Sequence, residues 1–389
     1  MSRPFAPSSL LVGNFVIGTS VLAPTGMLNE LSAGFGVTIR EASLLITFGA
    51  IVMCLGSPLL AWWTSRIDRR LLLGSSLGLV ALGHLASAYA DSYAMLLAIR
   101  LLLLAAAAPF TAQAASSVQA LVPESQRAST IAFVFLGWSL ASAVGIPIVT
   151  QVAHSFGWRG AYGLLAALDA IACALLFWRM PRGLQVAPVE LRTWSTVARN
   201  ATIPRLLLIT VLLTSGQFAV FTFLAPLLRI VGGASATTTA LVFALFGSAG
   251  VLGNLTATRF VGAWGPYKTS RIAVVCMLLG VTGWTLAAPT LALMAASVFV
   301  WGLGFASSNS MQQARLVAAA PPAASASVAL NTSSIYIGQA LGSAVGGVIF
   351  ERQAYAQLGP LAAVFMVIGL AVLLSTRPAD ASPRPVSAG

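Results

Sequence analysis

Twelve apolar segments, most of them about 20 residues long, fill almost the whole 389-residue chain. A helix needs about 20 apolar residues to cross the hydrocarbon core of a bilayer. The segments lie at 8–29, 42–63, 71–90, 93–120, 129–153, 160–178, 204–228, 236–258, 268–287, 290–317, 327–348 and 358–376. This pattern predicts an all-α membrane protein with twelve transmembrane helices.

Basic residues are distributed unequally between the two sides of these helices. If the N-terminus is cytoplasmic, only four of the 21 basic residues fall on the outer side: Arg40, Arg159, Arg229 and Arg352. Arg100 lies inside a segment, and the other 16 lie on the cytoplasmic side. This asymmetry follows the positive-inside rule. It predicts a multi-pass membrane protein with both termini in the cytoplasm.

Composition excludes several classes of protein. Charged residues make up 8% of the chain, against about 25% in soluble proteins. The net charge of +12 is scattered over short loops, which favours lipid headgroups over nucleic acid as its partner. The three cysteines lie in apolar segments without CxxC or Cys/His spacing. We therefore expect no metal, cofactor or nucleic-acid site, and no clustered catalytic set indicates an enzyme.

The chain divides into two six-helix halves, 1–179 and 204–376. Residues 180–203 between them hold three arginines and two prolines, which predicts a cytoplasmic linker. The tail at 377–389 is rich in proline, serine and alanine, and we expect it to be disordered in the cytoplasm.

Two further patterns concern the halves. The string LAP occurs at 22–24 and at 224–226, in the first helix of each half, which suggests a duplicated architecture. Glycines recur at helical spacing in two segments, where small residues let helix backbones approach closely. They are Gly247, Gly250 and Gly253 in the eighth segment, and Gly338, Gly342, Gly346 and Gly347 in the eleventh.

Six stretches carry motifs in a recognisable order. They include GSPLLAWWTSRIDRRLLL at 56–73, IRLLLLAAAAPF at 99–110 and GWSLASAVGIPIVTQVAHSFGWRGAYG at 137–163, with others at 15–37, 218–235 and 329–349. Together they resemble the major facilitator superfamily, and within it the bacterial drug/proton antiporters of the arabinose-efflux-permease type. The resemblance implies a protein of the bacterial inner membrane, efflux by alternating access, drug resistance, and a cavity between the halves lined by helices one, four, seven and ten.

The chain departs from the family pattern where proton coupling is expected. The family has a buried glutamate in the first helix, and Val21 occupies that place. The aspartate of the loop after the second helix becomes Ser65, and Gly262 stands where its second-half copy has an acid. These departures leave open whether transport is coupled to protons.

Arg100 is the basic residue inside the fourth segment. An ionisable side chain in the hydrocarbon costs at least about 2.5–3.5 kcal/mol, so it needs a partner or a function. Three roles are open. Arg100 could bind a polar or anionic part of the substrate, hold the fourth helix against the first, or reach the outer interface by snorkelling.

Asp169 is the acid placed deepest in the membrane, and His84 lies at a similar depth in the third segment. In the resembled fold the third and sixth helices are neighbours. We therefore predict a contact between His84 and Asp169, which serves either structure or proton coupling.

Polar and aromatic residues at helical spacing predict a substrate cavity, since small-molecule sites combine aromatic walls with a few directional polar groups. Hydrogen bonding between helices is the alternative for each residue. The candidates are Asn14, Thr25, Arg100, Thr111, Gln217, Phe221, Trp301, Phe305, Ser308, Gln312, Asn331, Ser334 and Tyr336.

The family's loop between the second and third helices helps to latch the two halves together. The corresponding charges are Arg66, Asp68, Arg69 and Arg70, with Arg259 at the equivalent end of the eighth segment. Plain topogenic charge is the alternative.

We conclude that the sequence predicts a monomeric secondary transporter in the lipid bilayer, exporting a small polar or amphipathic molecule such as a drug, sugar or metabolite. The sequence leaves open whether protons are transported in the opposite direction. A proton-independent facilitator or exchanger is the alternative within transport. A non-transporting sensor or a membrane enzyme fits less well, because no soluble domain or catalytic set is present.

Overall fold

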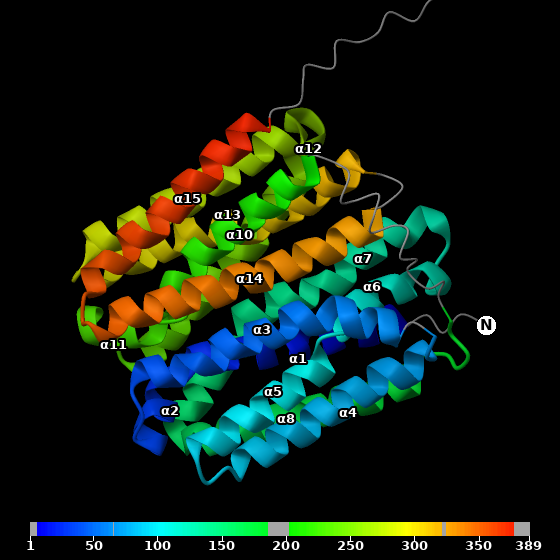
Figure 1. The fold of residues 1–389 in the computed structure, drawn as a ribbon, viewed down its shortest axis with the longest axis horizontal. Helices are drawn as coiled ribbons and strands as arrows, with labels where there is room; N and C mark the ends of the chain where they lie inside the picture. Colours follow the sequence, from blue (N-terminus) through cyan, green and yellow to red (C-terminus); the bar gives the residue numbers. More distant parts are fainter. Residues whose placement is uncertain (1–5, 65, 186–201, 321–323, 377–389) are drawn as a thin grey trace, which may run out of the picture.

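The computed structural model describes residues 6–64, 66–185, 202–320 and 324–376, and these form α-helices without any β-strand. Figure 1 shows the helices packed side by side as one long bundle. The first six spans contain α1 (Ala6–Gly26), α2 (Leu28–Phe35), α3 (Ile39–Trp63), α4 (Arg69–Ala88), α5 (Tyr93–Ala107), α6 (Phe110–Leu121), α7 (Glu124–Leu140), a π-helical turn η1 (Ala141–Gly145) and α8 (Ile146–Arg179). The last six contain α10 (Thr202–Phe221), α11 (Leu224–Gly232), α12 (Ala236–Ala287), α13 (Leu291–Ala319), α14 (Ala324–Glu351), the 3-10 turn η3 (Tyr355–Gln357) and α15 (Leu358–Ser375).

Ten described helical stretches are long and apolar enough to cross a membrane, and two of them are long enough to contain two spans each. The stretch at 129–179 leaves helical geometry at Gly157 (φ 72°), and the stretch at 236–287 does so at Gly265 (φ 74°). Positive φ suits glycine, which lacks a Cβ. Counting each as two spans confirms the twelve predicted helices. Each glycine lies in a gap between two predicted spans, 154–159 or 259–267, and helix continues up to and from it.

Proline explains the interruption of the fourth span. Helix α5 ends at Ala107 and α6 starts at Phe110, with Pro109 between them. Proline has no N–H and its ring clashes with the preceding turn, so a helix breaks there. Most of the predicted linker, at 186–201, and the predicted tail at 377–389 lie outside the described residues.

Glycines allow close helix packing, as predicted. Gly338, Gly342 and Gly346 of α14 face α10, and a Cβ at Gly338 would lie 2.6 Å from the carbonyl oxygen of Val211. One and two turns further on, Cβ atoms at Gly342 and Gly346 would meet the carbonyls of Ser215 and Ala219. Only glycine permits this backbone contact along three turns, and packing of this kind stabilises helix pairs in lipid.

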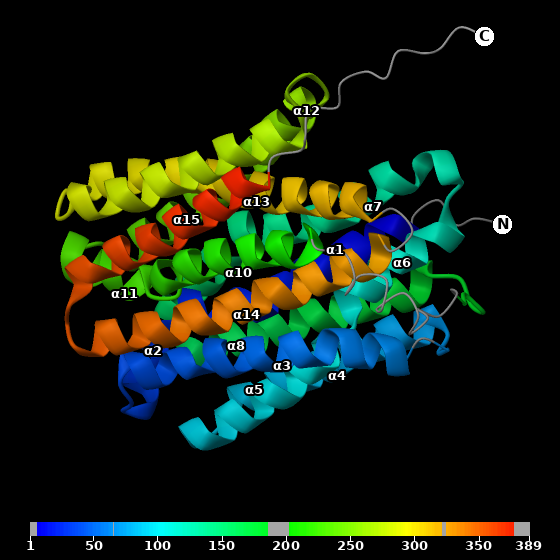
Figure 2. The same ribbon diagram turned by 45° about the horizontal axis from the view of Figure 1, so that its top comes forward.

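The first six spans meet the last six along two seams. Helix α3 packs against α14, and Figures 1 and 2 show them running side by side. Helix α12 packs against η1 and α8. In the second seam Gly247 of α12 touches the backbone of Ala143 in η1. A cavity lies between these seams.

Candidate substrate cavity

A cavity of about 400 Å³ lies between the two sets of helices. Its walls come from α1, α3, α7, η1, α10, α12, α13, α14 and the junction of α5 with α6. This volume falls in the usual range for small-molecule sites. The polar side chains that line it are Ser57, Thr111, Trp138, Ser139, Ser142, Thr210, Thr214, Gln217, Asn254, Thr258, Ser308, Asn309, Ser310, Gln312, Gln313, Thr332, Tyr336 and Gln339.

The cavity occupies one half of the bundle. It extends to Ile131 and Gln313, each about two turns from the end of its helix, and to Thr258, about two turns before the turn of α12 at Gly265. These helix ends lie where α1 begins, and we call this the open end. At the opposite end, the closed end, α2 packs against α11. Figure 2 shows α2 and α11 together at the left, away from the first turn of α1.

The lining is uncharged. Among the described residues, none that lines the cavity is Asp, Glu, Lys, Arg or His. Hydroxyl and amide groups alternate with apolar surface and with five aromatic rings: Phe135, Trp138, Phe218, Phe305 and Tyr336. Such a surface offers hydrogen bonds without net charge.

A chain of hydrogen bonds fixes the wall formed by the first six spans. The indole Nε1 of Trp138 donates to Thr111 Oγ1 (3.3 Å), and Thr111 Oγ1 donates to Asn14 Oδ1 (2.9 Å). Asn14 Nδ2 then donates to the carbonyl of Val134 (3.1 Å). A Cβ at Gly18 would lie 3.1 Å from the Trp138 ring, so the glycine makes room for the indole.

A second network fixes the opposite wall. Thr210 Oγ1 donates to Asn331 Oδ1 (2.7 Å), and Asn331 Nδ2 donates to Asn309 Oδ1 (3.2 Å). Gln312 Nε2 donates to the carbonyl of Leu206 (2.6 Å), and its Oε1 accepts from Arg315 (3.1 Å). Gln312 is therefore engaged with protein at both ends of its amide.

Six of the predicted cavity residues line the cavity: Thr111, Gln217, Phe305, Ser308, Gln312 and Tyr336. The other seven do not line it in this structure. Asn14 and Asn331 lie behind the walls in the two networks, while Thr25 and Ser334 are buried elsewhere. Phe221 and Trp301 are buried in an aromatic cluster with Phe246, their rings 4.8 and 5.3 Å from its ring.

Arg100 is the last of the seven predicted residues that do not line the cavity. It lies behind the wall and joins α5 to α1. Its guanidinium donates to the carbonyls of Ser20 (2.7 Å) and Val21 (2.8 Å), and the residue is 1% exposed. Pro24 has no N–H, so Ser20 lacks the helical donor four residues on. Arg100 supplies that donor. Of the three roles left open, this geometry matches holding the fourth helix against the first, and the burial contradicts snorkelling.

His84 and Asp169 meet as predicted. His84 Nδ1 lies 2.6 Å from Asp169 Oδ2, and both side chains are fully buried between α4 and α8. The His84 ring stacks on Tyr162, with centroids 5.8 Å apart. This pair lies within the first six spans, and neither residue lines the cavity.

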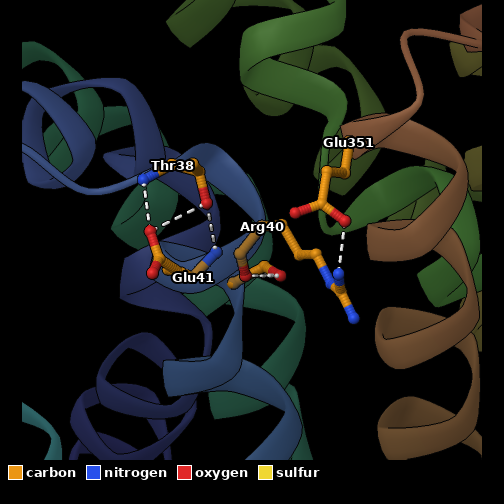
Figure 3. Close-up of polar contacts among 5 residues, drawn as sticks. Thr38, Arg40, Glu41 and Glu351 are labelled. Atoms are coloured by element: carbon orange, nitrogen blue, oxygen red, sulfur yellow. Dashed lines mark hydrogen bonds and ion pairs between the residues drawn. The ribbon is translucent and has the colours of Figure 1, made fainter.

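An ion pair joins the two sets of helices at the closed end. The Arg40 guanidinium of α3 binds the Glu351 carboxylate of α14, as Figure 3 shows. Thr38 and Glu41 cap the start of α3 reciprocally, since the Thr38 N–H donates to Glu41 Oε2 (2.7 Å) and the Glu41 N–H donates to Thr38 Oγ1 (3.1 Å). This cap holds the helix end that carries Arg40.

Glu30 lies nearby on α2, beyond the first candidate span at 6–26. Burial raises the pKa of its carboxyl, while a backbone hydrogen bond and the charges of His154 and Arg229 oppose this shift. Arg229 belongs to α11 of the last six spans. Glu30 therefore lies where α2 meets α11 at the closed end, a different contact from the α3–α14 seam of the Arg40–Glu351 pair.

The predicted latch residues form local contacts. Asp68 Oδ1 caps α4 by accepting from the Leu71 N–H (3.0 Å). Arg70 donates to the carbonyl of Phe177, which ties α4 to α8. Arg69 is buried, whereas Arg66 is exposed on the loop and Arg259 is exposed on α12. The contact between the two halves that the latch requires stays a prediction.

Sequence reasoning missed Trp138, Asn309 and Asn254 as cavity residues. Trp138 lies within the motif stretch at 137–163, one residue after Gly137, so a signal was present. Asn309 neighbours the predicted Ser308 on α13.

Helices long and apolar enough to cross a membrane, packed around a largely apolar cavity with polar side chains in its wall, are the architecture of a multi-pass membrane transporter of small molecules. The Major Facilitator Superfamily model matches residues 10–332. The chain belongs to the Major Facilitator Superfamily, and its relatives are transporters.

Several curated proteins are similar along almost their whole length. The inner membrane transport protein YdhP of Escherichia coli (strain K12) is 29% identical over 97% of both chains. The uncharacterized MFS-type transporter YbcL of Bacillus subtilis (strain 168) is 25% identical over 98% of both. A probable sugar efflux transporter of Mannheimia succiniciproducens is 25% identical over 92% of this chain and 89% of its own.

Solved structures show the same fold. A bacterial homolog of the human lysosomal transporter Spinster, in an inward-facing and unoccupied conformation, superposes with a TM-score of 0.77. It covers 98% of this chain and 99% of its own at 16% identity. The peptide transporter POT superposes with a TM-score of 0.76 at 15% identity.

Proposed function

We propose that this protein exports a small polar or amphipathic molecule across the inner membrane by alternating access. The observation that carries the proposal is the cavity, which extends from the middle of the bundle to the open end while α2 and α11 close the other end. A cavity with one closed end is what an alternating-access carrier presents in one of its two states.

The orientation of the cavity in the membrane follows from charge. The positive-inside rule puts the open end, where α1 begins, in the cytoplasm. The structure then corresponds to the state that accepts substrate from inside the cell. Efflux is also the activity named for the Mannheimia relative, whose printed substrate class is sugar.

Export requires the closed end to open while the open end closes. At the closed end, the Arg40–Glu351 pair joins the two sets of helices and would break in that transition. Contacts that exist in only one state set the balance between the states.

Two coupling schemes remain, each supported by one observation. The buried His84–Asp169 pair is a group that can hold a proton inside the membrane, which favours proton antiport. Val21 at the family's acidic position, together with the uncharged lining of the described cavity, favours a facilitator or exchanger driven by the substrate gradient.

Efflux from proteoliposomes, measured for a panel of sugars, drugs and metabolites with and without an imposed pH gradient, tests the proposal. Flux that accelerates with the gradient in the wild type and falls in Asp169→Asn supports antiport. Flux indifferent to the gradient supports the facilitator. Absence of flux for every compound would contradict the export function.

A further inference from the structure

We infer that the cavity selects an uncharged, hydroxyl-rich molecule with one apolar face, such as a neutral glycoside, and that Trp138 and Gln217 decide this selectivity. The inference rests on the proposed export function, because it names the chemical class that the same cavity accepts.

The uncharged lining excludes charged substrates. An ion that leaves water for a site in the middle of a membrane protein needs a counter-charge or a dense shell of dipoles. None of the described lining residues supplies a counter-charge. The nearest buried charges are already engaged: Arg100 with the α1 backbone, and Arg315 with Gln312 and Thr376. Hydroxyl and amide groups instead replace the hydrogen bonds that a neutral polyol makes with water.

Two amides in the described lining keep an unpaired buried atom: Asn254 has a free acceptor, Oδ1, and Gln217 has a free donor, Nε2. Gln217 lines the cavity from α10, one turn before the break at 222–223, and is only 2% exposed. Its Nε2 has no hydrogen-bond partner within the described part of the chain. Gln312, which also lines the cavity, uses both ends of its amide on protein. An unpaired buried donor costs free energy unless a ligand or water satisfies it. A hydroxyl or ether oxygen is the acceptor that matches an amide N–H.

Trp138 supplies the apolar surface on the opposite set of helices. Its indole N–H is bound to Thr111, and Gly18 leaves space for the ring edge. The ring is therefore fixed before substrate binds, with α1 packed against one side of it, and the residue lines the cavity, where it can meet the C–H surface of a sugar ring. A fixed aromatic platform loses little conformational entropy on binding.

Three phenyl glycosides that differ only in charge test the inference: phenyl β-D-glucopyranoside, its glucuronide analogue, and its 2-amino-2-deoxy analogue. Transport is measured by counterflow in proteoliposomes, and binding by calorimetry in detergent. We expect the neutral glycoside to be transported at least tenfold faster than either charged analogue.

Variants then locate the selectivity. Gln217→Glu places a carboxylate at the inner end of the cavity, in the middle of the bundle, and should raise the ratio of amino-sugar to neutral flux at least tenfold. Gln313→Glu is the matched control, because Gln313 lines the cavity near the open end, where water screens a charge. It should change the ratio less than twofold. Trp138→Ala should raise KM for the neutral glycoside tenfold, whereas Trp138→Phe should largely restore it.

Equal transport of the three glycosides, or preference for a charged one, would overturn the inference. So would an unchanged flux ratio in Gln217→Glu, provided that size-exclusion chromatography shows a folded variant. Failure to bind or move any of the three would also overturn it. Cysteine cross-linking across the closed end reports whether the protein alternates between states. A protein that alternates but does not prefer the neutral glycoside would contradict the substrate class and leave the transporter function standing.

Discussion

The Arg40–Glu351 ion pair should bias the protein toward the closed conformation of the α2 end. The perturbation is a double-mutant cycle with Arg40→Ala, Glu351→Ala and both changes together. A charge swap, Arg40→Glu with Glu351→Arg, tests whether the interaction depends on charge rather than on side-chain shape.

The magnitude follows from exposure. The Arg40 and Glu351 side chains are 42% and 46% exposed, so water screens much of their attraction. Exposed ion pairs contribute about 0.2–1 kcal/mol. At 25 °C this corresponds to a change of roughly 1.4- to 5-fold in the ratio of closed to open populations. Each single variant should show this loss, and raising the salt concentration should diminish it in the wild type.

The assay is the distance between spin labels at the two sides of the closed end. Labels at positions 33 and 352, which are exposed on α2 and just after α14, report the opening directly. Cys54, Cys173 and Cys276 are replaced first, since all three are free thiols. A coupling energy of zero in the cycle would refute the reasoning, as would a charge swap that leaves the end as open as either single variant.

Three further predictions concern other buried or half-buried charges. Arg100→Ala should abolish transport while the protein stays folded in the membrane. Its free energy of unfolding should fall by about 1–3 kcal/mol, because the Ser20 carbonyl loses its hydrogen-bond donor. Wild-type flux in this variant would contradict the positioning role. His84→Ala should destabilise the protein by about 3–5 kcal/mol, because it leaves a buried carboxylate unpaired. Asp169→Asn retains a hydrogen-bond acceptor and should destabilise the protein less than His84→Ala. Thermal unfolding in detergent ranks the two variants, and the reverse order would argue against a charged pair. Burial raises the pKa of Glu30 at the closed end, so protonation of this carboxyl favours the closed conformation, and lowering the pH through and below the raised pKa should close this end further. Glu30→Gln should reduce this pH response, measured with the same spin labels. An unchanged pH response in the variant would exclude Glu30 as its cause.

The sequence alone was sufficient for the spans and for one buried contact. Hydropathy is a local property, because each backbone segment in lipid must satisfy its own hydrogen bonds as a helix. The twelve spans could therefore be read from the residues one segment at a time. The His84–Asp169 contact was also predictable, since an ionisable group in lipid requires a partner and the third and sixth helices are neighbours in the resembled fold.

Only the tertiary structure decided which polar residues face the cavity. Helical spacing shows that Trp301, Phe305 and Gln312 share a stripe, but not how that helix is rotated against its neighbours. Packing against Phe246 buries Trp301, whereas Phe305 reaches the cavity. That rotation is set by contacts between helices distant in sequence, such as glycine against backbone, which no local pattern encodes.

The role of Arg100 shows the same division. Its position inside a span is evident from the sequence, and so is the need for a partner. The partner is a backbone carbonyl that Pro24 leaves without its helical donor, on a helix about 80 residues away. Local chemistry determined that each buried charge needs a partner, and the three-dimensional packing of α1 against α5 determined which group that partner is.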